Sequence, residues 1–203
     1  MPVPFSEVDK EKIRTQLMDA ARTSFAERGL QGTSLVSLTD AAAISKSSFY
    51  AFFDSKEALY LALLGELGPE VEARVVAPIV QSSLSAGDAL ATFLQAFLSE
   101  LEGQPLLRRL LEHPEELRTV ARRVGLEELE AKARALAPLH AFLERLQESG
   151  QLRSDVPPEV MVGALRAVLI LALHADTLAP HHAEVMELMV KLVAEGLTTP
   201  GRR

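Results

Sequence analysis

The chain has 203 residues, which is enough for one domain of average size together with a smaller one. It contains no cysteine, so disulfides and thiolate metal sites are excluded, and its formal net charge of −7 argues against a protein that coats nucleic acid non-specifically. The longest apolar run, 167–173, is far too short to span a membrane, and the acidic Glu7, Asp9 and Glu11 do not fit a signal peptide, so we expect a cytoplasmic protein without a membrane span.

A first short helix is predicted to begin at Leu35. Leu35, Leu38 and Ala42 recur at helical spacing and give this helix an apolar face. Either Thr33 or Ser34 can accept a hydrogen bond from a backbone N–H and cap its start. The apolar face predicts packing of this helix against its neighbours.

A second short helix is predicted after a tight turn. Ser45 is a suitable N-cap for it. Phe49 and Phe53 are four residues apart, so they share one face of the helix and should turn inward. The faces left open to solvent or to a DNA groove carry Lys46, Ser47, Ser48, Tyr50 and Ala51.

A longer third helix is predicted to start at Asp54 or Ser55, with Lys56 in its first turn. The N-terminal end of a helix attracts anions, and a lysine there favours phosphate binding. Two short helices that present small polar side chains and spaced lysines are suited to a DNA groove. This segment therefore predicts a DNA-binding head.

The remainder of the chain is predicted to be helical, with no convincing strand. Proline and glycine divide it into successive helices. The first is expected from 55 to about 68–69, where Gly68-Pro69 breaks or kinks it. The others are expected at 86–101, at 105–113, from 114, at 126–149 with a kink at Pro138, at 157–178 and at 180–197. No repeat or low-complexity linker separates the parts, so we expect the N-terminal part to be docked rather than tethered.

The last two predicted helices are the most apolar. The first is apolar over most of its circumference, through Val160, Gly163, Ala164, Ala167, Val168, Ile170, Leu171 and Ala172. The second has a wide apolar stripe, formed by Val185, Leu188, Met189, Leu192 and Val193. The first of these helices needs burial on nearly all sides. We predict that they form a four-helix bundle with a second copy of the chain; the alternative is that both belong to the core of the monomer.

Several short motifs follow one another in a fixed order in the first third of the chain. They are Arg14, Leu17, Ala20, Ala21, Phe25 and Ala26-Glu27-Arg28-Gly29, then Thr33-Ser34-Leu35, Leu38-Thr39, Ala42-Ala43-Ile44-Ser45-Lys46, Phe49-Tyr50-Ala51-Phe52-Phe53 and Ser55-Lys56-Glu57-Ala58-Leu59. In this order they resemble the tetracycline-repressor (TetR) family of one-component regulators. Ala43 stands where the family usually has glycine, so either a positive φ there costs about 1 kcal/mol or the turn has a different shape. Thr39 replaces a small apolar residue, and its hydroxyl needs a partner such as a backbone carbonyl one turn back.

The resemblance implies an all-α fold with a three-helix helix-turn-helix DNA-binding domain at 1–54 and a larger helical effector-binding and dimerisation domain at 55–203. It implies a sequence-specific transcriptional regulator, a repressor that binds a palindromic double-stranded operator as a homodimer and is released by a small, largely apolar ligand. The residues expected to contact DNA are Thr33, Ser34, Ser45, Lys46, Ser47, Ser48, Tyr50, Ala51 and Lys56.

Two roles are expected within this set. Lys46, Tyr50 and Lys56, joined by Thr33, should contact phosphates, and the short side chains of Ser47, Ser48 and Ala51 should face base edges. Specificity then depends in part on DNA shape. The charge distribution agrees, since residues 1–60 carry 7 Lys/Arg against 8 Asp/Glu, whereas 61–203 carry 14 against 20.

The resemblance also implies a ligand cavity among the C-terminal helices. Candidate lining residues are Phe93, Phe97, Leu110, His140, Phe142, Arg166 and His174. Each has a structural alternative. A histidine on an apolar helix face is usually hydrogen-bonded within the protein, Phe93 and Phe97 fit a plain core, and Arg166 could pair with an acidic residue across a dimer.

Other function classes fit less well. A metal-responsive regulator could use His181 and His182 with His174, but no carboxylate four residues away completes a site. The chain has no Cys, no Glu-x-x-His pair and no Gly-rich phosphate loop, so no enzyme, catalytic residue, metal or cofactor is expected. A helical interaction protein remains the other alternative, although it does not explain the placement of Lys46 and Lys56.

Overall fold

The computed structural model describes residues 6–127, 129, 137–174 and 180–198. The secondary structure in these ranges is helical, apart from an isolated antiparallel bridge between Leu152 and Thr198, so the expected all-α fold is confirmed. The chain forms two compact units. Unit 1 comprises Met1–Leu67 and Pro105–Ala133, and unit 2 comprises Gly68–Gln104 and Arg134–Arg203.

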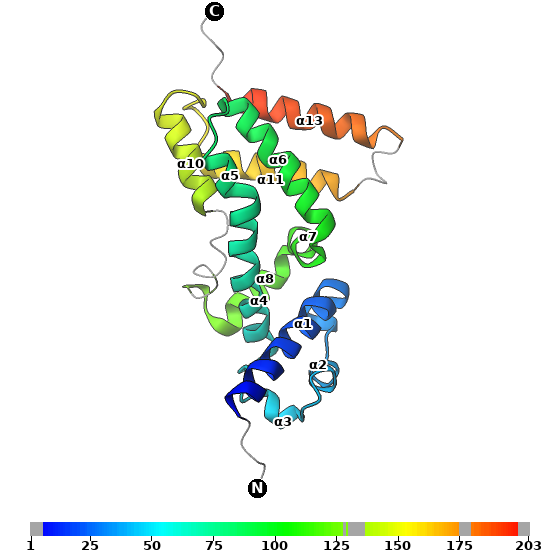
Figure 1. Ribbon diagram of the computed structural model, residues 1–203. Helices are drawn as coiled ribbons and strands as arrows, with labels where there is room; N and C mark the ends of the chain where they lie inside the picture. Colours follow the sequence, from blue (N-terminus) through cyan, green and yellow to red (C-terminus); the bar gives the residue numbers. More distant parts are fainter. Residues whose placement is uncertain (1–5, 128, 130–136, 175–179, 199–203) are drawn as a thin grey trace, which may run out of the picture. The chain divides into compact units, whose positions relative to one another are not determined.

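Unit 1 contains the predicted DNA-binding head. Its helices are α1 (Glu7–Gly32), α2 (Leu35–Ala41), α3 (Lys46–Phe49), the first part of α4 (Lys56–Val71), α7 (Pro105–Glu112) and α8 (Pro114–Val124) (Figure 1). They share one core, in which Leu17, Phe25, Leu38, Phe49 and Tyr60 have no exposed surface. Unit 1 therefore extends beyond residue 54 and includes a later segment, because α7 packs against α1. The functional boundary at residue 54 stays a prediction.

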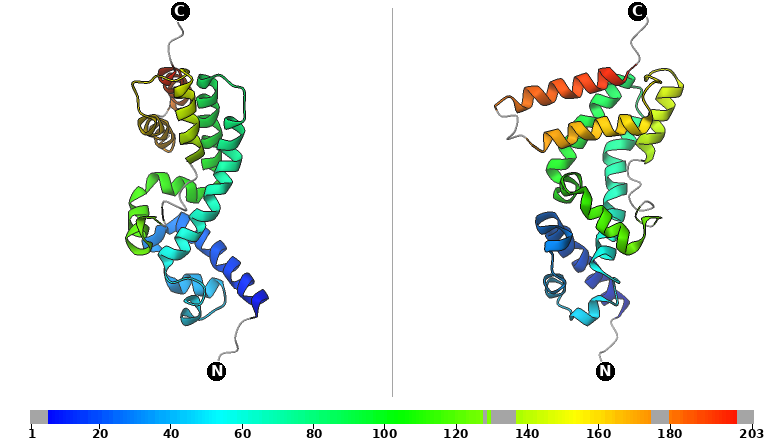
Figure 2. Two further views of the ribbon diagram at one scale, coloured as in Figure 1. Left: turned by 90° about the vertical axis from the view of Figure 1, so that its left-hand side faces the viewer. Right: turned by 180° about the vertical axis from the view of Figure 1, so that it is seen from behind.

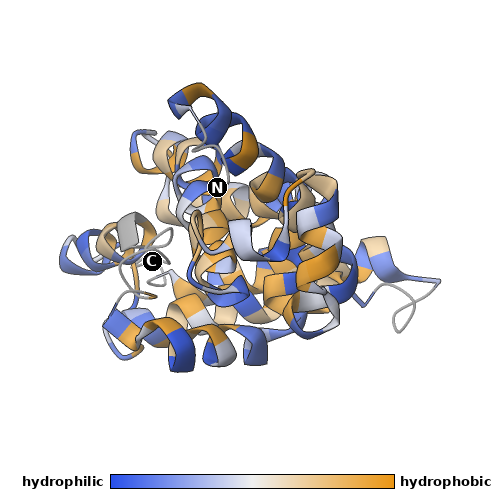
Figure 3. Ribbon diagram, turned by 90° about the horizontal axis from the view of Figure 1, so that it is seen from below, coloured by the Kyte–Doolittle hydropathy of each residue, from blue (hydrophilic) through white to orange (hydrophobic). Residues whose placement is uncertain are grey.

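Unit 2 contains the remaining described helices. They are η1 (Glu72–Val76), α5 (Ala77–Val80), α6 (Ala86–Gly103), α10 (Ala137–Glu148), α11 (Pro158–Ala172) and α13 (His182–Leu197). Helices α11 and α13 run antiparallel, and both pack against α6 (Figures 1 and 2). Single helices carry hydrophobic and hydrophilic residues on different faces (Figure 3), which is the pattern expected of helices that bury one side. None of the described helices is both long and apolar enough to cross a membrane.

Two predicted helix ends are wrong. Helix α4 continues through Pro69 to Val71, and a π-helical turn, η1, joins it to α5. Pro78 has no N–H for the carbonyl of Arg74 and its ring crowds that carbonyl, which accounts for the wider turn just before it. Helix α11 ends at Ala172, earlier than expected.

The other expected helices agree with the structure within a few residues, including α6, α7, α8 and α13. Residues 128, 130–136 and 175–179 lie outside the described residues. The first two of these gaps fall within the helix expected at 126–149, so its continuity and its kink at Pro138 stay predictions.

Candidate DNA-binding site

Helices α2 and α3 are each capped by a serine, as predicted. The Ser34 hydroxyl accepts from the Ser37 N–H at 3.0 Å, and the Ser45 hydroxyl accepts from the Ser48 N–H at 3.1 Å. Phe49, at the end of α3, is fully buried. The serine caps fix where each short helix begins, although each helix is too short to be stable alone.

The aromatic residues of the second helix turn inward. Phe49 and Phe53 have exposed fractions of 0% and 6%, and their ring centroids are 6.0 Å apart. The guanidinium of Arg14 on α1 lies 4.7 Å from the centroid of the Phe53 ring and helps to hold α1 against this segment. The predicted inward face is confirmed.

In the turn between the two helices, Ala43 adopts a positive φ, which is costly for a residue with a side chain. Its φ is 53°, in the left-handed region that favours glycine, and its N–H donates to the Asp40 carbonyl at 3.1 Å. The Thr39 hydroxyl donates to the carbonyls of Leu35 and Val36 at 3.1 and 3.0 Å. Of the two alternatives at Ala43, the structure has the positive φ, and the expected backbone partner of Thr39 one turn back is confirmed.

The remaining side chains of this segment form an outward surface. Lys46, Ser47, Tyr50 and Ala51 are exposed, and Tyr50 retains 58% of its accessible surface. The Tyr50 ring stands edge-on to the Phe49 ring at 5.5 Å, which limits its orientations while the hydroxyl stays free to reach outward. Within the described part of the chain, the Lys46 ammonium has no ion-pair or hydrogen-bond partner.

The serines of this surface differ in their availability. The Ser45 hydroxyl lies 2.8 Å from the hydroxyls of both Ser47 and Ser48, and Ser48 is half-buried. Ser45 is thus occupied as a cap, whereas Ser47 is exposed and can exchange its partner for a base or phosphate. Ser34 is exposed and also acts as a cap.

Two residues expected to contact phosphate have other partners. Thr33 is 1% exposed, and its hydroxyl donates to the carbonyls of Gly29 and Ser24 at 2.8 and 3.1 Å, so its side chain is not available for the contact expected of it. The Lys56 ammonium donates to the carbonyls of Leu30 and Thr33 at 2.9 and 2.5 Å. Lys56 therefore joins α4 to the end of α1 and keeps one N–H for a phosphate.

Unit 1 also contains a buried ion pair, between Glu116 and Arg109, that was not predicted from the sequence. The Glu116 carboxylate accepts hydrogen bonds from Arg109 and from the Tyr60 hydroxyl. Burial, followed by the neighbouring carboxylate, raises the pKa of Tyr60. No motif marks these residues, because their partners are far apart along the chain.

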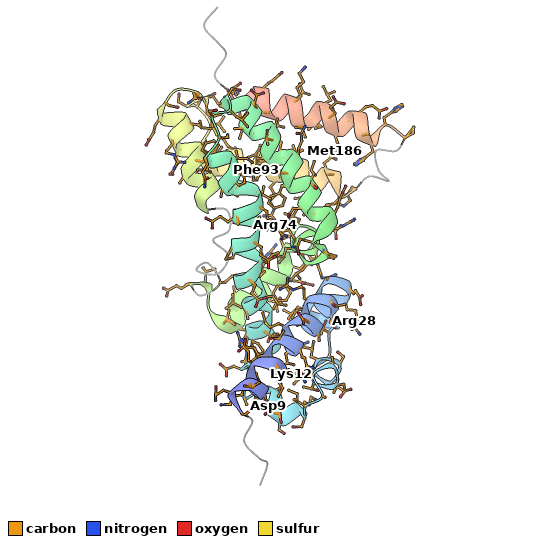
Figure 4. The ribbon with its side chains drawn as sticks, in the orientation of Figure 1. Asp9, Lys12, Arg28, Arg74, Phe93 and Met186 are labelled. Atoms are coloured by element: carbon orange, nitrogen blue, oxygen red, sulfur yellow. The ribbon has the colours of Figure 1, made fainter. Side chains whose placement is uncertain are left out.

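The candidate ligand residues are divided between the two units. Phe93 and Phe97 are buried on α6 with ring centroids 5.7 Å apart, and Phe142 on α10 is 9% exposed; Figure 4 labels Phe93 among the helices of unit 2. Leu110 is half-buried in unit 1. His140 Nε2 lies 3.7 and 3.6 Å from carboxylate oxygens of Glu144 and Glu159.

The two polar residues expected on α11 point outward. Arg166 is exposed, and so is His174, whose Nδ1 lies 2.9 Å from the Ile170 carbonyl oxygen. Neither is a polar head buried inside this chain, because the apolar side of α11 that faces the core carries Met161, Leu165, Val168 and Leu169. Over the described ranges, no three His, Cys, Asp or Glu residues are arranged to hold a metal ion.

Comparison with known proteins agrees with this geometry. The family profile described as bacterial regulatory proteins, tetR family, matches residues 17–63. The chain is 31% identical over 174 residues to the HTH-type transcriptional repressor AcnR of Corynebacterium diphtheriae, with 83% of each chain covered. It is 28% identical over 199 residues to the HTH-type transcriptional repressor KstR2 of Rhodococcus jostii, with 92% of each covered.

The fold is also that of a solved structure. The transcriptional regulator FadR of Bacillus subtilis, in complex with stearoyl-CoA, superposes with a TM-score of 0.67 at 19% identity, covering 90% of this chain and 98% of FadR. The residues that match the family profile, 17–63, include α2, the turn and α3, which are the elements that form the outward surface described above. The chain thus belongs to the tetR family of bacterial regulatory proteins and is a helix-turn-helix transcriptional regulator.

Proposed function

We propose that this regulator is a cytoplasmic homodimeric repressor that binds a palindromic operator through α3 and leaves it when a small, largely apolar molecule binds among its C-terminal helices. The observation that carries the DNA-binding part is the division of one short segment into two faces. Within residues 46–53, Phe49 and Phe53 are buried, while Lys46, Tyr50 and Ala51 are exposed. Such a segment is positioned by its core and free to meet DNA.

The proposed contacts differ in kind. Lys46 and the Tyr50 hydroxyl contact phosphates, with Lys56 offering its remaining N–H, and these contacts fix register without reading sequence. Ser47 and Ala51 approach base edges, where a hydroxyl bonds either base type and a methyl group packs against thymine. Because no long side chain in this surface offers bidentate base recognition, DNA shape contributes to specificity.

The dimer is proposed from the outer faces of α11 and α13. On α13, Met186, Val190, Ala194 and Leu197 face the core of unit 2. The opposite side still carries Leu188 and Leu192, which are 54% and 52% exposed, and α11 adds Val160 at 57%. Burying each of these half-exposed side chains against a second copy contributes about 1 kcal/mol. The neighbouring Gly163 leaves open space, which allows close approach of another helix.

The oligomeric state can be tested with one substitution. Leu188→Glu should convert the dimer into a monomer in size-exclusion chromatography with light scattering, because it places a charge in the proposed apolar interface. Leu84→Glu is the matched control, since Leu84 is 44% exposed in the loop before α6 and outside the interface. A wild-type chain that is monomeric at micromolar concentration, or a Leu188→Glu variant that stays dimeric, would contradict the proposal.

The effector is proposed to be apolar because the core of unit 2, where the ligand is proposed to bind, consists of aromatic and aliphatic side chains that include Phe93, Phe97 and Phe142. The FadR structure, with its stearoyl-CoA, makes long acyl chains the first class to examine. Stearoyl-CoA should lower operator affinity at least tenfold, and free coenzyme A is the control for its polar head. Unchanged affinity with stearoyl-CoA and with stearate would exclude this class.

The DNA-binding function is tested first by selection from a random duplex library. We expect enrichment of a palindrome, and Lys46→Ala should weaken binding to all sequences and reduce the slope of log affinity against log salt by about 1. Arg122→Ala, which removes an exposed cation from α8 and lies outside the proposed interface, is the control. Failure to enrich any duplex would refute the function, and a change in base preference alone would refute the role of Lys46.

A further inference from the structure

Unit 1 contains one buried carboxylate that collects donors from three other elements. Glu116 of α8 is 7% exposed. Its Oε1 accepts from Arg109 Nε and Nη2 of α7 at 3.0 and 2.7 Å and from the Leu30 N–H of α1 at 3.3 Å, and its Oε2 accepts from the Tyr60 hydroxyl of α4 at 3.0 Å. Such charge-assisted bonds in a buried setting are the strong ones, and removing one partner leaves the others unpaired.

The peptide groups of Leu30 are held from both sides. Its N–H donates to Glu116, and its carbonyl accepts from the Lys56 ammonium at 2.9 Å. Lys56 also binds the carbonyl of Thr33, the last residue before the cap of α2. The stretch that leads from α1 to α2 is therefore held by side chains from α4 and α8 in addition to the bonds that Thr33 makes within α1.

Gly29 makes this arrangement possible. Helix α1 is interrupted there, with φ 72° and ψ 176°, a conformation that is essentially restricted to glycine. A Cβ at this position would lie 2.0 Å from Arg109 Nη2 and 2.3 Å from Glu116 Oε1. The ion pair thus lies directly against the backbone at the interruption of α1.

The element that supplies the carboxylate is connected to the other unit through a short path. Helix α6 of unit 2 ends at Gly103, and α7 begins at Pro105, so only Gln104 separates them. Helix α8 follows α7 after His113 alone. Few residues outside helices therefore separate α6 from Arg109 and Glu116 along the chain.

We propose that Glu116 is a positioning residue for DNA binding. Through Arg109, Leu30 and Tyr60 it sets the direction in which the chain leaves α1, and thereby the orientation of α2 and α3 within unit 1. The inference rests on the proposed dimeric DNA-binding function, since orientation matters most where two heads must match two half-sites.

The test compares operator spacings. Duplexes with one base pair inserted between the half-sites of the selected operator rotate one half-site relative to the other. The wild-type dimer should bind the altered spacing at least tenfold more weakly than the selected one. Glu116→Gln, which keeps the shape but removes the charge, should reduce this ratio to threefold or less. Glu112→Gln is the control, since Glu112 pairs with Arg108 at 3.1 Å on the exposed side of α7 and should leave the ratio unchanged.

A purely structural role would lower the folded fraction without changing the spacing ratio, so an unchanged ratio in Glu116→Gln overturns the inference. If that variant does not fold, Tyr60→Phe removes a single donor and should still reduce the ratio. Amide hydrogen exchange provides a readout without DNA: Leu30 should exchange at least tenfold faster in Glu116→Gln, and a wild-type rate would overturn the contact. If the wild-type chain enriches no duplex, the proposed function fails and the positioning role with it.

Discussion

Replacing Ala43 by glycine should stabilise unit 1. Ala43 is exposed and adopts a φ of 53°, so its methyl group gains no burial while the backbone is in the left-handed region. For an L-residue this conformation costs about 1–2 kcal/mol. Glycine avoids that cost but has a more flexible unfolded chain, which offsets about 0.4–1 kcal/mol. The expected net gain in the free energy of unfolding is about 1 kcal/mol.

Tyrosine fluorescence reports this transition selectively. The chain has two tyrosines and no tryptophan, and Tyr50 and Tyr60 both belong to unit 1. Urea unfolding followed by this signal should give a higher midpoint for Ala43→Gly with an unchanged slope. In thermal unfolding, the melting temperature should rise by about 2–4 °C for a protein of this size.

Ala41→Gly is the matched control. Ala41 is also exposed and lies two residues earlier, at the end of α2, with no positive φ. The same chemical change should therefore destabilise unit 1, by up to about 1 kcal/mol, because glycine is a poor helix former. Opposite signs at the two positions would support the reasoning. A loss of stability in Ala43→Gly similar to that in Ala41→Gly would refute it, because the left-handed turn would then carry no strain.

Further predictions follow from the partners of individual side chains. Lys56→Met should lower the stability of unit 1 by about 1–3 kcal/mol, since two buried carbonyls lose a charged donor, whereas Lys46→Met should change it by less than about 0.5 kcal/mol. Equal effects in urea unfolding would contradict this distinction. The raised pKa of Tyr60 predicts a loss of stability at alkaline pH, because above about pH 10 the unfolded chain releases the phenolic proton that the folded chain retains. Stability should fall by at most about 1.4 kcal/mol per pH unit from this group. Tyr60→Phe should remove that contribution and Tyr50→Phe should not; identical alkaline slopes for Tyr60→Phe and wild type would count against it.

Features decided within one helical turn were predicted from the sequence. The caps Ser34 and Ser45 depend only on a hydroxyl placed three residues before a backbone N–H. The inward face of Phe49 and Phe53 follows from helical periodicity, and the motif marked Ala43 as the place where a positive φ would be strained. Such features need no knowledge of distant residues, because the interacting groups lie next to each other along the chain.

Helix ends and outward faces were harder, since neighbouring helices decide them. Pro69 was expected to break or kink α4, yet the helix continues to Val71, because a proline forfeits one hydrogen bond and packing on both sides can compensate for it. Arg166 and His174 lie among apolar residues in the sequence, which suggested a pocket. The side of α11 that faces the core is set by α6 and α13, and these two residues fall on the other side.

The roles of charged residues were the least predictable, because the role of a charged side chain depends on the groups that it contacts in the fold, and these are often distant in the sequence. Glu116 would be expected on the surface like most glutamates, and it is buried only because donors 7, 56 and 86 residues away converge on it. The same reasoning separates the two lysines of the DNA-binding segment. Lys46 and Lys56 both occupy the first position of a helix, and sequence analysis assigned both to phosphate. Two carbonyls at the end of α1 engage Lys56 and none engages Lys46, so the two should differ in how they respond to salt and to substitution.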